Sequence, residues 1–215
     1  MNEIVLEQSA RTKIRRLPER GCYDRAVIEA ILDKALICHV GFVAGDHPVV
    51  IPTIHARVGD ALYFHGSPAA GMLRALQDGA EACVTVTLLD GLVLARSAFH
   101  HSMNYRSVVV FGKAEEVTDR EEKLRVLSAL VEHVCRGRSA EARAPNENEL
   151  RKTIVLRLPL TEASAKIRTG PPKDDDADLQ LPIWAGVLPL ALVPGVPVAD
   201  NDEPVPESVR RYGRG

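Results

Sequence analysis

The turn that follows a short apolar run, FHGSPAAGMLRAL, has the composition of an anion-binding loop. His65 and Gly66 end the apolar run, Ser67 follows, and Arg74 lies one turn into what we expect to be a short helix. Glycine allows a tight turn, and the free N–H groups at a helix start attract anions, so this stretch could cradle a phosphate. An ordinary capped helix after a strand would have the same sequence, and the residues alone leave both interpretations open.

A second polar group opens the strand-like stretch MNYRSVVVFG. Strand alternation places Tyr105 and Ser107 on one face and Arg106 on the other. The hydroxyls can hydrogen-bond a flat heteroaromatic ring, and a guanidinium suits a phosphate or a carboxylate. Solvated residues at a strand end are the competing interpretation.

The sole tryptophan, Trp184 in LPIWAGVLPL, would pack either against a cofactor edge or as a hydrophobic plug.

Motifs of metal, nucleophile and nucleotide sites are missing from the sequence. The four cysteines form no CxxC pair and the seven histidines no HExxH pattern, so we predict no metal site. There is no GxSxG elbow, which argues against a serine hydrolase. Without GxGxxG or GxxxxGK(S/T), a Rossmann domain and a P-loop enzyme are also disfavoured.

Charge and hydropathy narrow the class of partner and the compartment. The 215 residues include 27 basic and 29 acidic side chains, for a net charge of −2. This balance supplies no field that would recruit nucleic acid, so no nucleic-acid partner is expected. We expect no membrane span, and the start MNEIVLEQSARTKIRR lacks the apolar stretch of a signal peptide. A cytoplasmic protein is therefore predicted.

Short apolar runs separated by Gly-Asp breaks indicate a β-meander with few helices. The stretch after Asp24, a candidate N-cap, has a helical apolar face, a short helix is expected from Ser67, and Thr118 with Glu121 has the spacing of a capping box. The pattern predicts a mainly β, antiparallel barrel. We expect an N-terminal arm over residues 1–22, the barrel domain over 23–193 and a flexible proline-rich tail over 194–215.

Longer pieces, taken in order, resemble a known family: the FMN-binding split-barrel proteins related to pyridoxamine 5′-phosphate oxidase, in particular the nitroimidazole-reductase-like branch. The pieces are PVVIPTIHARVGDALYFHGS, GMLRAL, NYRSVVVFGKAEEV, SAKIRTGPP and PIWAGVLPL, within about residues 12–190. The resemblance implies a six-stranded antiparallel split β-barrel with a few flanking α-helices. It also implies a homodimer with FMN at the subunit interface.

The resemblance further implies which residues contact the flavin. His65 matches a histidine near the flavin in the nitroimidazole-reductase-like branch and is the catalytic candidate. The basic pair that receives phosphate in the oxidases is replaced by 69–72, so Arg74 or an N-terminal arginine is expected to compensate. The cofactor-binding residues implied by position are Ile51, Pro52, Thr53, Ile54, His65, Gly66, Ser67, Arg74, Tyr105, Arg106, Ser107 and Trp184.

The function implied is an FMN-dependent oxidoreductase that reduces a small-molecule substrate with electrons from NAD(P)H. Oxidase activity on pyridoxamine phosphate is not expected, because the family's basic pattern after the tryptophan is missing. One alternative is a flavin carrier or sensor without catalysis. Others are a haem-handling protein, with His100 and His101 as the candidate ligands, an F420-handling protein, and a flavin-free structural dimer.

Overall fold

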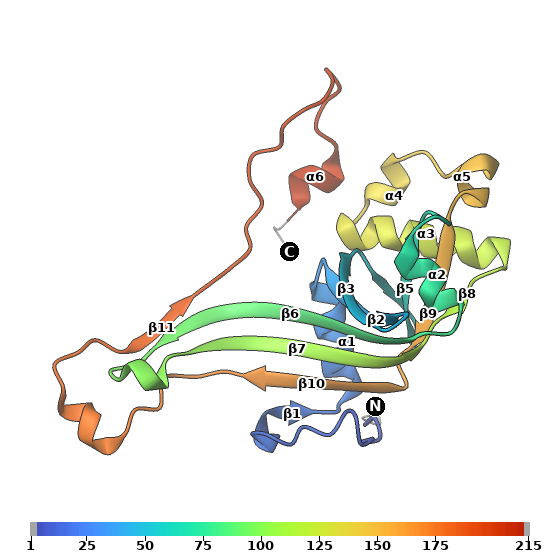
Figure 1. The fold of residues 1–215 in the computed structure, drawn as a ribbon. Helices are drawn as coiled ribbons and strands as arrows, with labels where there is room; N and C mark the ends of the chain where they lie inside the picture. Colours follow the sequence, from blue (N-terminus) through green and yellow to red (C-terminus); the bar gives the residue numbers. More distant parts are fainter. Residues whose placement is uncertain (1–3, 213–215) are drawn as a thin grey trace.

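The computed structural model describes residues 4–212, which form two antiparallel sheets flanked by helices (Figure 1). Strands make up 34% and helices 27% of the chain, so the predicted mainly β class is confirmed. The larger sheet has the order β1 (Gly21–Cys22), β10 (Glu162–Arg168), β7 (Ser102–Lys113), β6 (Glu81–Leu94), β2 (Cys38–Ala44), β3 (His47–Thr53), and β11 (Gly186–Pro189) also pairs with β6. The smaller sheet has the order β4 (Ala56–Val58), β5 (Ala61–Gly66), β9 (Ile154–Pro159), β8 (Glu115–Glu116).

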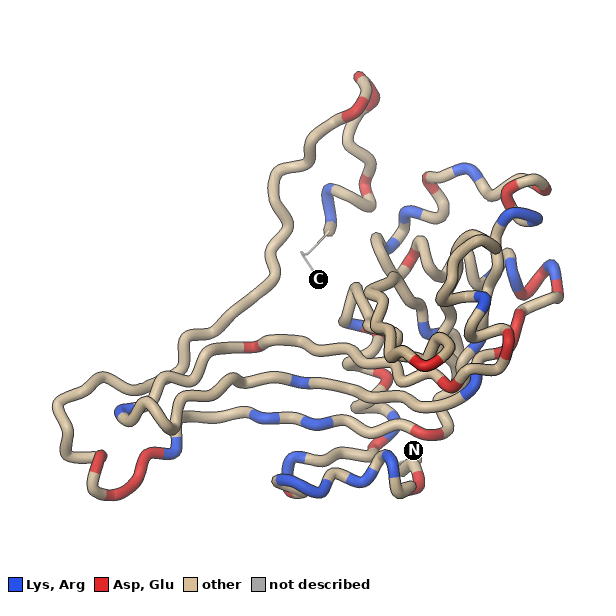
Figure 2. Tube along the Cα trace, in the orientation of Figure 1, with Lys and Arg blue, Asp and Glu red and all other residues tan. Residues whose placement is uncertain are grey.

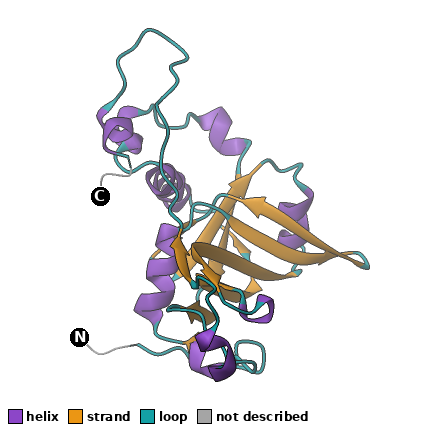
Figure 3. Ribbon diagram, turned by 90° about the vertical axis from the view of Figure 1, so that its left-hand side faces the viewer, coloured by secondary structure: helices purple, strands orange, loops and turns teal. Residues whose placement is uncertain are grey.

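Six α-helices lie around the curved strands, as Figure 3 shows from the side. Three of them pack on the sheets: α1 (Arg25–Lys34), α2 (Gly71–Gln77) and α3 (Arg120–Val134). The short helices α4 (Arg138–Glu141) and α5 (Glu147–Arg151) follow α3, and α6 (Glu207–Arg211) ends the described chain. Single 3-10 turns occur at η1 (Pro18–Arg20), η2 (Ala98–His100) and η3 (Asp176–Gln180). Among the described residues, no helix has both the length and the apolarity needed to cross a bilayer.

The core lies between α1, α2 and the inner faces of both sheets. Alternating residues of β6, such as Val84 and Val86, are fully buried against Ile28 and Leu32 of α1 and Phe64 of β5. As predicted, Asp24 caps α1, and its carboxylate accepts hydrogen bonds from the N–H groups of residues 26 (2.7 Å) and 27 (3.2 Å). Period-two burial in the strands and a capped amphipathic helix therefore build the core that the sequence predicts.

Two predicted helix starts are wrong, one by three residues and the other by one. The helix expected from Ser67 begins at Gly71, because the Ser67 hydroxyl accepts from the Ala69 N–H (3.2 Å) and closes a separate turn before the helix. In α3 the N-cap is Asp119 rather than Thr118, and its carboxylate accepts from the Glu122 N–H (2.7 Å). Aspartate is the better N-cap of two adjacent candidates.

β6 and β7 extend beyond the core as a long hairpin, with η2 at its tip (Figure 1). A register shift between Leu89 and Gly91 interrupts the hairpin ladder where β11 comes alongside. A Cβ on Gly91 would lie 3.0 Å from the carbonyl oxygen of Leu188, so only glycine lets β11 approach this closely. The hairpin therefore carries the C-terminal part of the chain away from the core.

Both predicted terminal segments contact the domain. In the expected N-terminal arm, β1 pairs with β10, and the Lys166 ammonium donates to the carbonyl oxygen of Arg16 (3.0 Å). In the expected tail, α6 lies against α4, where the Ser208 N–H donates to the Glu141 carboxylate (3.1 Å). Basic side chains gather on the N-terminal segment and on the neighbouring β10, as Figure 2 shows, whereas the chain leading to α6 carries none over 181–199.

Candidate functional site

A cavity of about 740 Å³ lies where the end of β5 faces α3 and the α4–α5 segment. Apolar side chains of α3 and of Ile54, which follows β3, form most of its wall, and Ala142, Ala144 and Pro145 close another side. This volume falls within the range of natural cofactor and ligand pockets. The lining favours a large, mainly apolar ligand.

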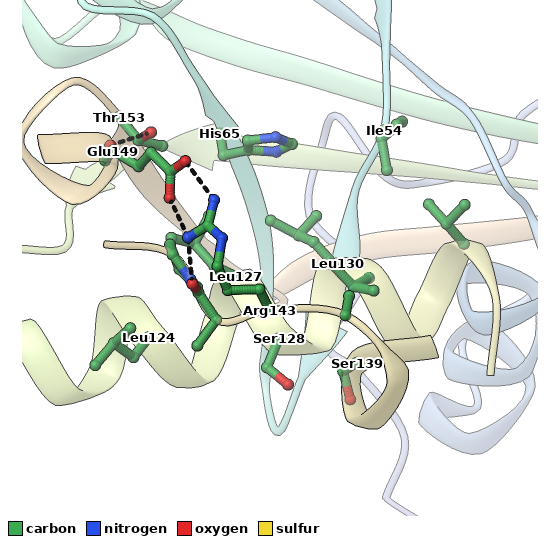
Figure 4. Close-up of a pocket in the computed structure, with 15 residues that line it drawn as sticks. Ile54, His65, Leu124, Leu127, Ser128, Leu130, Ser139, Arg143, Glu149 and Thr153 are labelled. Carbon is green, nitrogen blue, oxygen red and sulfur yellow. Dashed lines mark hydrogen bonds and ion pairs between the residues drawn. The ribbon is translucent and has the colours of Figure 1, made fainter. Parts of the chain in front are cut away.

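His65 is the histidine on the cavity wall, and Figure 4 shows its ring directed into the space between the strands and α3. Its Nδ1 atom is buried and has no hydrogen-bond partner among the described residues. Burial lowers the pKa of the His65 imidazole, because the cationic form loses hydration. At neutral pH the ring is therefore neutral and offers a nitrogen lone pair rather than a positive charge.

An ion pair lies at the rim of the cavity on the α4–α5 segment. The Arg143 guanidinium donates two hydrogen bonds to the Glu149 carboxylate, at 2.7 and 3.0 Å (Figure 4). These bonds, with a further one from the Asn146 N–H, lower the pKa of Glu149 to about 2. The Thr153 hydroxyl donates to the carbonyl oxygen of Glu149 (2.8 Å), which holds the end of α5 at the cavity. The rim thus presents a balanced ion pair beside an apolar cavity.

Two of the twelve predicted cofactor residues, His65 and Ile54, line this cavity together. Ile51, Pro52 and Thr53 lie just before it on β3, which is an edge strand of the larger sheet. The exposed fractions of Ile51 and Ile54 are 39% and 38%, so both present apolar surface to the outside. The chain therefore reaches the cavity wall at Ile54, directly after the end of β3.

The turn after His65 is stabilised locally. Gly66 continues the pairing of β5 with β9, and a Cβ there would come within 3.0 Å of Leu73 in α2. The Arg74 guanidinium donates to the carbonyl oxygen of Ala69 (3.0 Å), and Ser67 is bonded to the N–H of Ala69 as described above. Gly66 thus allows close packing of α2, and the polar side chains brace the turn.

Tyr105, Arg106 and Ser107 lie on β7 and do not line the cavity. The Arg106 guanidinium donates two hydrogen bonds to the Asp90 carboxylate, at 2.7 and 2.9 Å. The Ser107 hydroxyl donates to the carbonyl oxygen of Lys166 on β10 (3.2 Å). In a single copy, the charge of Arg106 is therefore already balanced by a neighbouring strand.

Trp184 lies just before β11, along the hairpin and away from the cavity (Figure 1). Its exposed fraction is 67%, and its ring lies over Gly186, where a Cβ would meet the ring at 2.8 Å. A single copy therefore does not bring Trp184 to His65.

The sequence analysis did not predict that α3 forms part of the cavity wall. Its apolar residues cover more than one face: Val126 and Leu130 are buried in the core, while Val131 and Val134 face the cavity with exposed fractions of 37% and 42%. An apolar surface wider than a core-facing stripe was the available signal.

His100 and His101, singled out for haem, lie at the hairpin tip and do not line the cavity; His100 is paired with Asp175. The described residues hold no cluster of three or more metal-ligating side chains.

A sequence profile described as pyridoxamine 5′-phosphate oxidase matches residues 24–167, which include β2 to β9, most of β10 and the cavity helix α3. The chain belongs to this family. The resemblance predicted from the sequence is thereby confirmed. None of the curated proteins searched matches the sequence.

Solved structures of the family include two that match nearly the whole chain. The flavocytochrome Anf3 of Azotobacter vinelandii is 40% identical with a TM-score of 0.86, over 94% of this chain and 96% of that one. An FAD and haem binding protein of Mycobacterium smegmatis is also 40% identical, with a TM-score of 0.85, over 89% of this chain and 96% of that one. A protein described as a 5-nitroimidazole antibiotic resistance protein, from Bacteroides thetaiotaomicron, is 27% identical with a TM-score of 0.59, over 68% and 86%.

Proposed function

We propose that this chain is a flavin-dependent redox protein that also binds haem in the cavity beside His65. The observation that carries the haem assignment is a buried, neutral imidazole with an unbonded ring nitrogen on the wall of a largely apolar chamber. Two relatives of 40% identity, which are described as a flavocytochrome and as an FAD and haem binding protein, support it.

The residues around the cavity fit a haem group. His65, which burial keeps neutral, would hold the haem iron through a ring nitrogen, as neutral histidines commonly do. The leucines and valines of α3 suit the apolar macrocycle. Bound haem and flavin would supply one- and two-electron transfer. The chain's own contribution is to hold the ligand nitrogen, exclude water and fix the orientation of the group.

We propose that the flavin lies against the exposed end of β3, with Ile51 to Ile54 beside it and Gly66 and Ser67 at the following turn. The exposed apolar side chains of Ile51 and Ile54 support this position. FMN is the flavin that the sequence resemblance predicts, whereas one 40% identical relative is named as binding FAD. Mass spectrometry of the flavin released by heating decides between the two.

The electron donor we propose is NAD(P)H, with a small molecule as the final acceptor. A carrier or sensor without turnover is the alternative, and steady-state oxidation of NADH or NADPH by the loaded protein separates the two. All four cysteines are free thiols, which suits the reducing cytoplasm that we propose as the compartment.

We propose that the working form is a homodimer with the flavin at the subunit interface. Large apolar side chains stand exposed on β2 and β3, including Val43 (58%) and Val50 (62%). Contiguous exposed apolar surface of this kind marks an interaction site.

The test is an absorption spectrum of the full chain after titration with haem and with flavin. We expect a Soret band and flavin bands that stay with the protein through desalting. His65→Ala should abolish the Soret band, and added imidazole should restore it by filling the space left by the ring. His101→Ala, which changes an exposed histidine at the hairpin tip, should bind haem like the unmodified chain. A Soret band retained unchanged by His65→Ala would contradict the assignment.

A further inference from the structure

Residues 181–199, called here the apolar arm, contain no charged side chain, no hydroxyl and no side-chain amide. The run, LPIWAGVLPLALVPGVPVA, includes four prolines and forms β11 followed by extended chain up to the approach to α6. A contiguous apolar segment of this length is unusual on the surface of a monomeric soluble protein.

The apolar arm is open to solvent in a single copy. Leu192, Val193, Val196 and Val198 have exposed fractions of 87%, 78%, 91% and 96%. Nine large apolar side chains of the arm are exposed in all. Burying each would remove on the order of 100 Å² from water, so the arm as a whole offers roughly 900 Å². A stable interface buries about 800 Å² on each partner.

Both ends of the arm are anchored, so it cannot simply collapse onto its own domain. At one end β11 pairs with β6, from Gly186 opposite Leu94 to Pro189 opposite Gly91. At the other end α6 is held on α4 by two hydrogen bonds from Ser208 to the Glu141 carboxylate. Between these anchors the chain spans an open loop, which Figure 1 shows standing away from both sheets.

The same chain carries a complementary surface on β2 and β3. Val43 and Val50 stand exposed there on one face of the sheet, and β3 has a neighbour on one side only. Every copy carries both the arm and this surface. Two copies related by a twofold axis could therefore bury both arms on both surfaces at once.

We propose that the apolar arm is a clasp: in the homodimer, the arm of each copy packs over the exposed apolar side of β2 and β3 in the other. This rests on the homodimer of the proposed function and names the segment that forms it. A lipid bilayer is a poorer occupant, since the prolines prevent a helix and an extended backbone would leave its N–H and C=O groups unbonded in hydrocarbon.

The experiment measures the mass of the full chain by light scattering and sedimentation over a range of concentrations. Val193→Lys with Val196→Lys changes the arm, and Val50→Lys changes the proposed receiving surface. The matched control, Ile4→Lys with Val5→Lys, changes residues of similar exposure (59% and 65%) in the N-terminal segment. We expect a dimer for the unmodified chain and the control. The arm and β3 variants should weaken it at least 30-fold, about 2 kcal/mol.

Fluorescence of Trp184, the single tryptophan, reports on the arm directly. Its emission should move to longer wavelength in the arm variant, because the indole loses the apolar contact of the second copy. A dimer unaffected by the arm variant, a monomeric unmodified chain, or a chain that sediments with phosphatidylcholine vesicles only when its arm is unchanged would each overturn the clasp. Cofactor binding is tested separately, by the absorption spectra. If the arm variant loses the dimer, the clasp is supported whether or not those spectra contain flavin and haem bands.

Discussion

The two ends of the molecule use apolar residues in opposite ways. Around β5 and α1, large apolar side chains such as Phe64 and Leu32 are completely buried within one copy. Along the hairpin and the apolar arm, side chains of the same kind, such as Leu192 and Val196, stand almost fully exposed. The first region folds because it buries its own surface, whereas the second leaves its apolar surface uncovered in a single copy. Substitutions in the first region should therefore change the free energy of unfolding, and substitutions in the second should change association between copies.

The largest effect is expected from truncation of the buried core. Phe64→Ala removes a ring with no exposed surface and leaves a cavity between the two sheets. The free energy of unfolding should fall by about 3–5 kcal/mol. Urea denaturation, followed by circular dichroism, measures this change. A loss below about 1 kcal/mol would mean that the core around β5 is less tightly packed than the structure shows.

A pH-dependent loss of stability is expected from His55, which is fully buried. Its Nε2 bonds the carbonyl oxygen of Leu32 (3.0 Å), its ring lies 4.7 Å from that of His133, and burial is the main cause that lowers its pKa to about 4. The unfolded chain takes up this proton near the ordinary pKa of 6.5, before the folded chain does. The titration of His55 therefore leaves the free energy of unfolding unchanged above about pH 6.5. As the pH drops from 6.5 toward 4, it lowers that free energy by on the order of 3 kcal/mol.

Denaturation at several pH values checks the prediction for His55. His55→Gln can still donate to Leu32 but does not titrate, so its stability should vary less over this range. An equally steep pH dependence in His55→Gln would assign the effect to other groups.

A smaller and more local effect is expected where β11 leaves the hairpin. Gly91→Ala places a methyl group 3.0 Å from the Leu188 carbonyl oxygen and 3.1 Å from the Val187 side chain. We expect a cost of about 1–3 kcal/mol, carried by β11 rather than by the core. Hydrogen exchange should show faster exchange of the β11 amides and unchanged exchange in β5 and β9. Uniformly faster exchange would contradict the separation of the two regions.

The smallest effect is expected from the arm itself, at concentrations where single copies predominate. Val196→Ser changes a side chain that is 91% exposed, so the free energy of unfolding of the isolated copy should change by less than about 0.5 kcal/mol. The same denaturation experiment as for Phe64→Ala, run at low protein concentration, measures it. A loss comparable to that of a core residue would mean that the arm is part of the folding unit of one copy.

The antiparallel class, the family and the α1 cap follow from the sequence alone, because each depends on residues near one another in the chain. Alternation sets which strand residues are buried, and Asp24 binds N–H groups two and three residues ahead. Contacts between distant segments decided the rest. The pairing of Arg106 with Asp90 depends on the register of two strands. The cavity at His65 depends on how α3 and the α4–α5 segment meet β5. An apolar residue has the same letter in a core, on a cavity wall and on an uncovered arm, and only its neighbours in space distinguish the three.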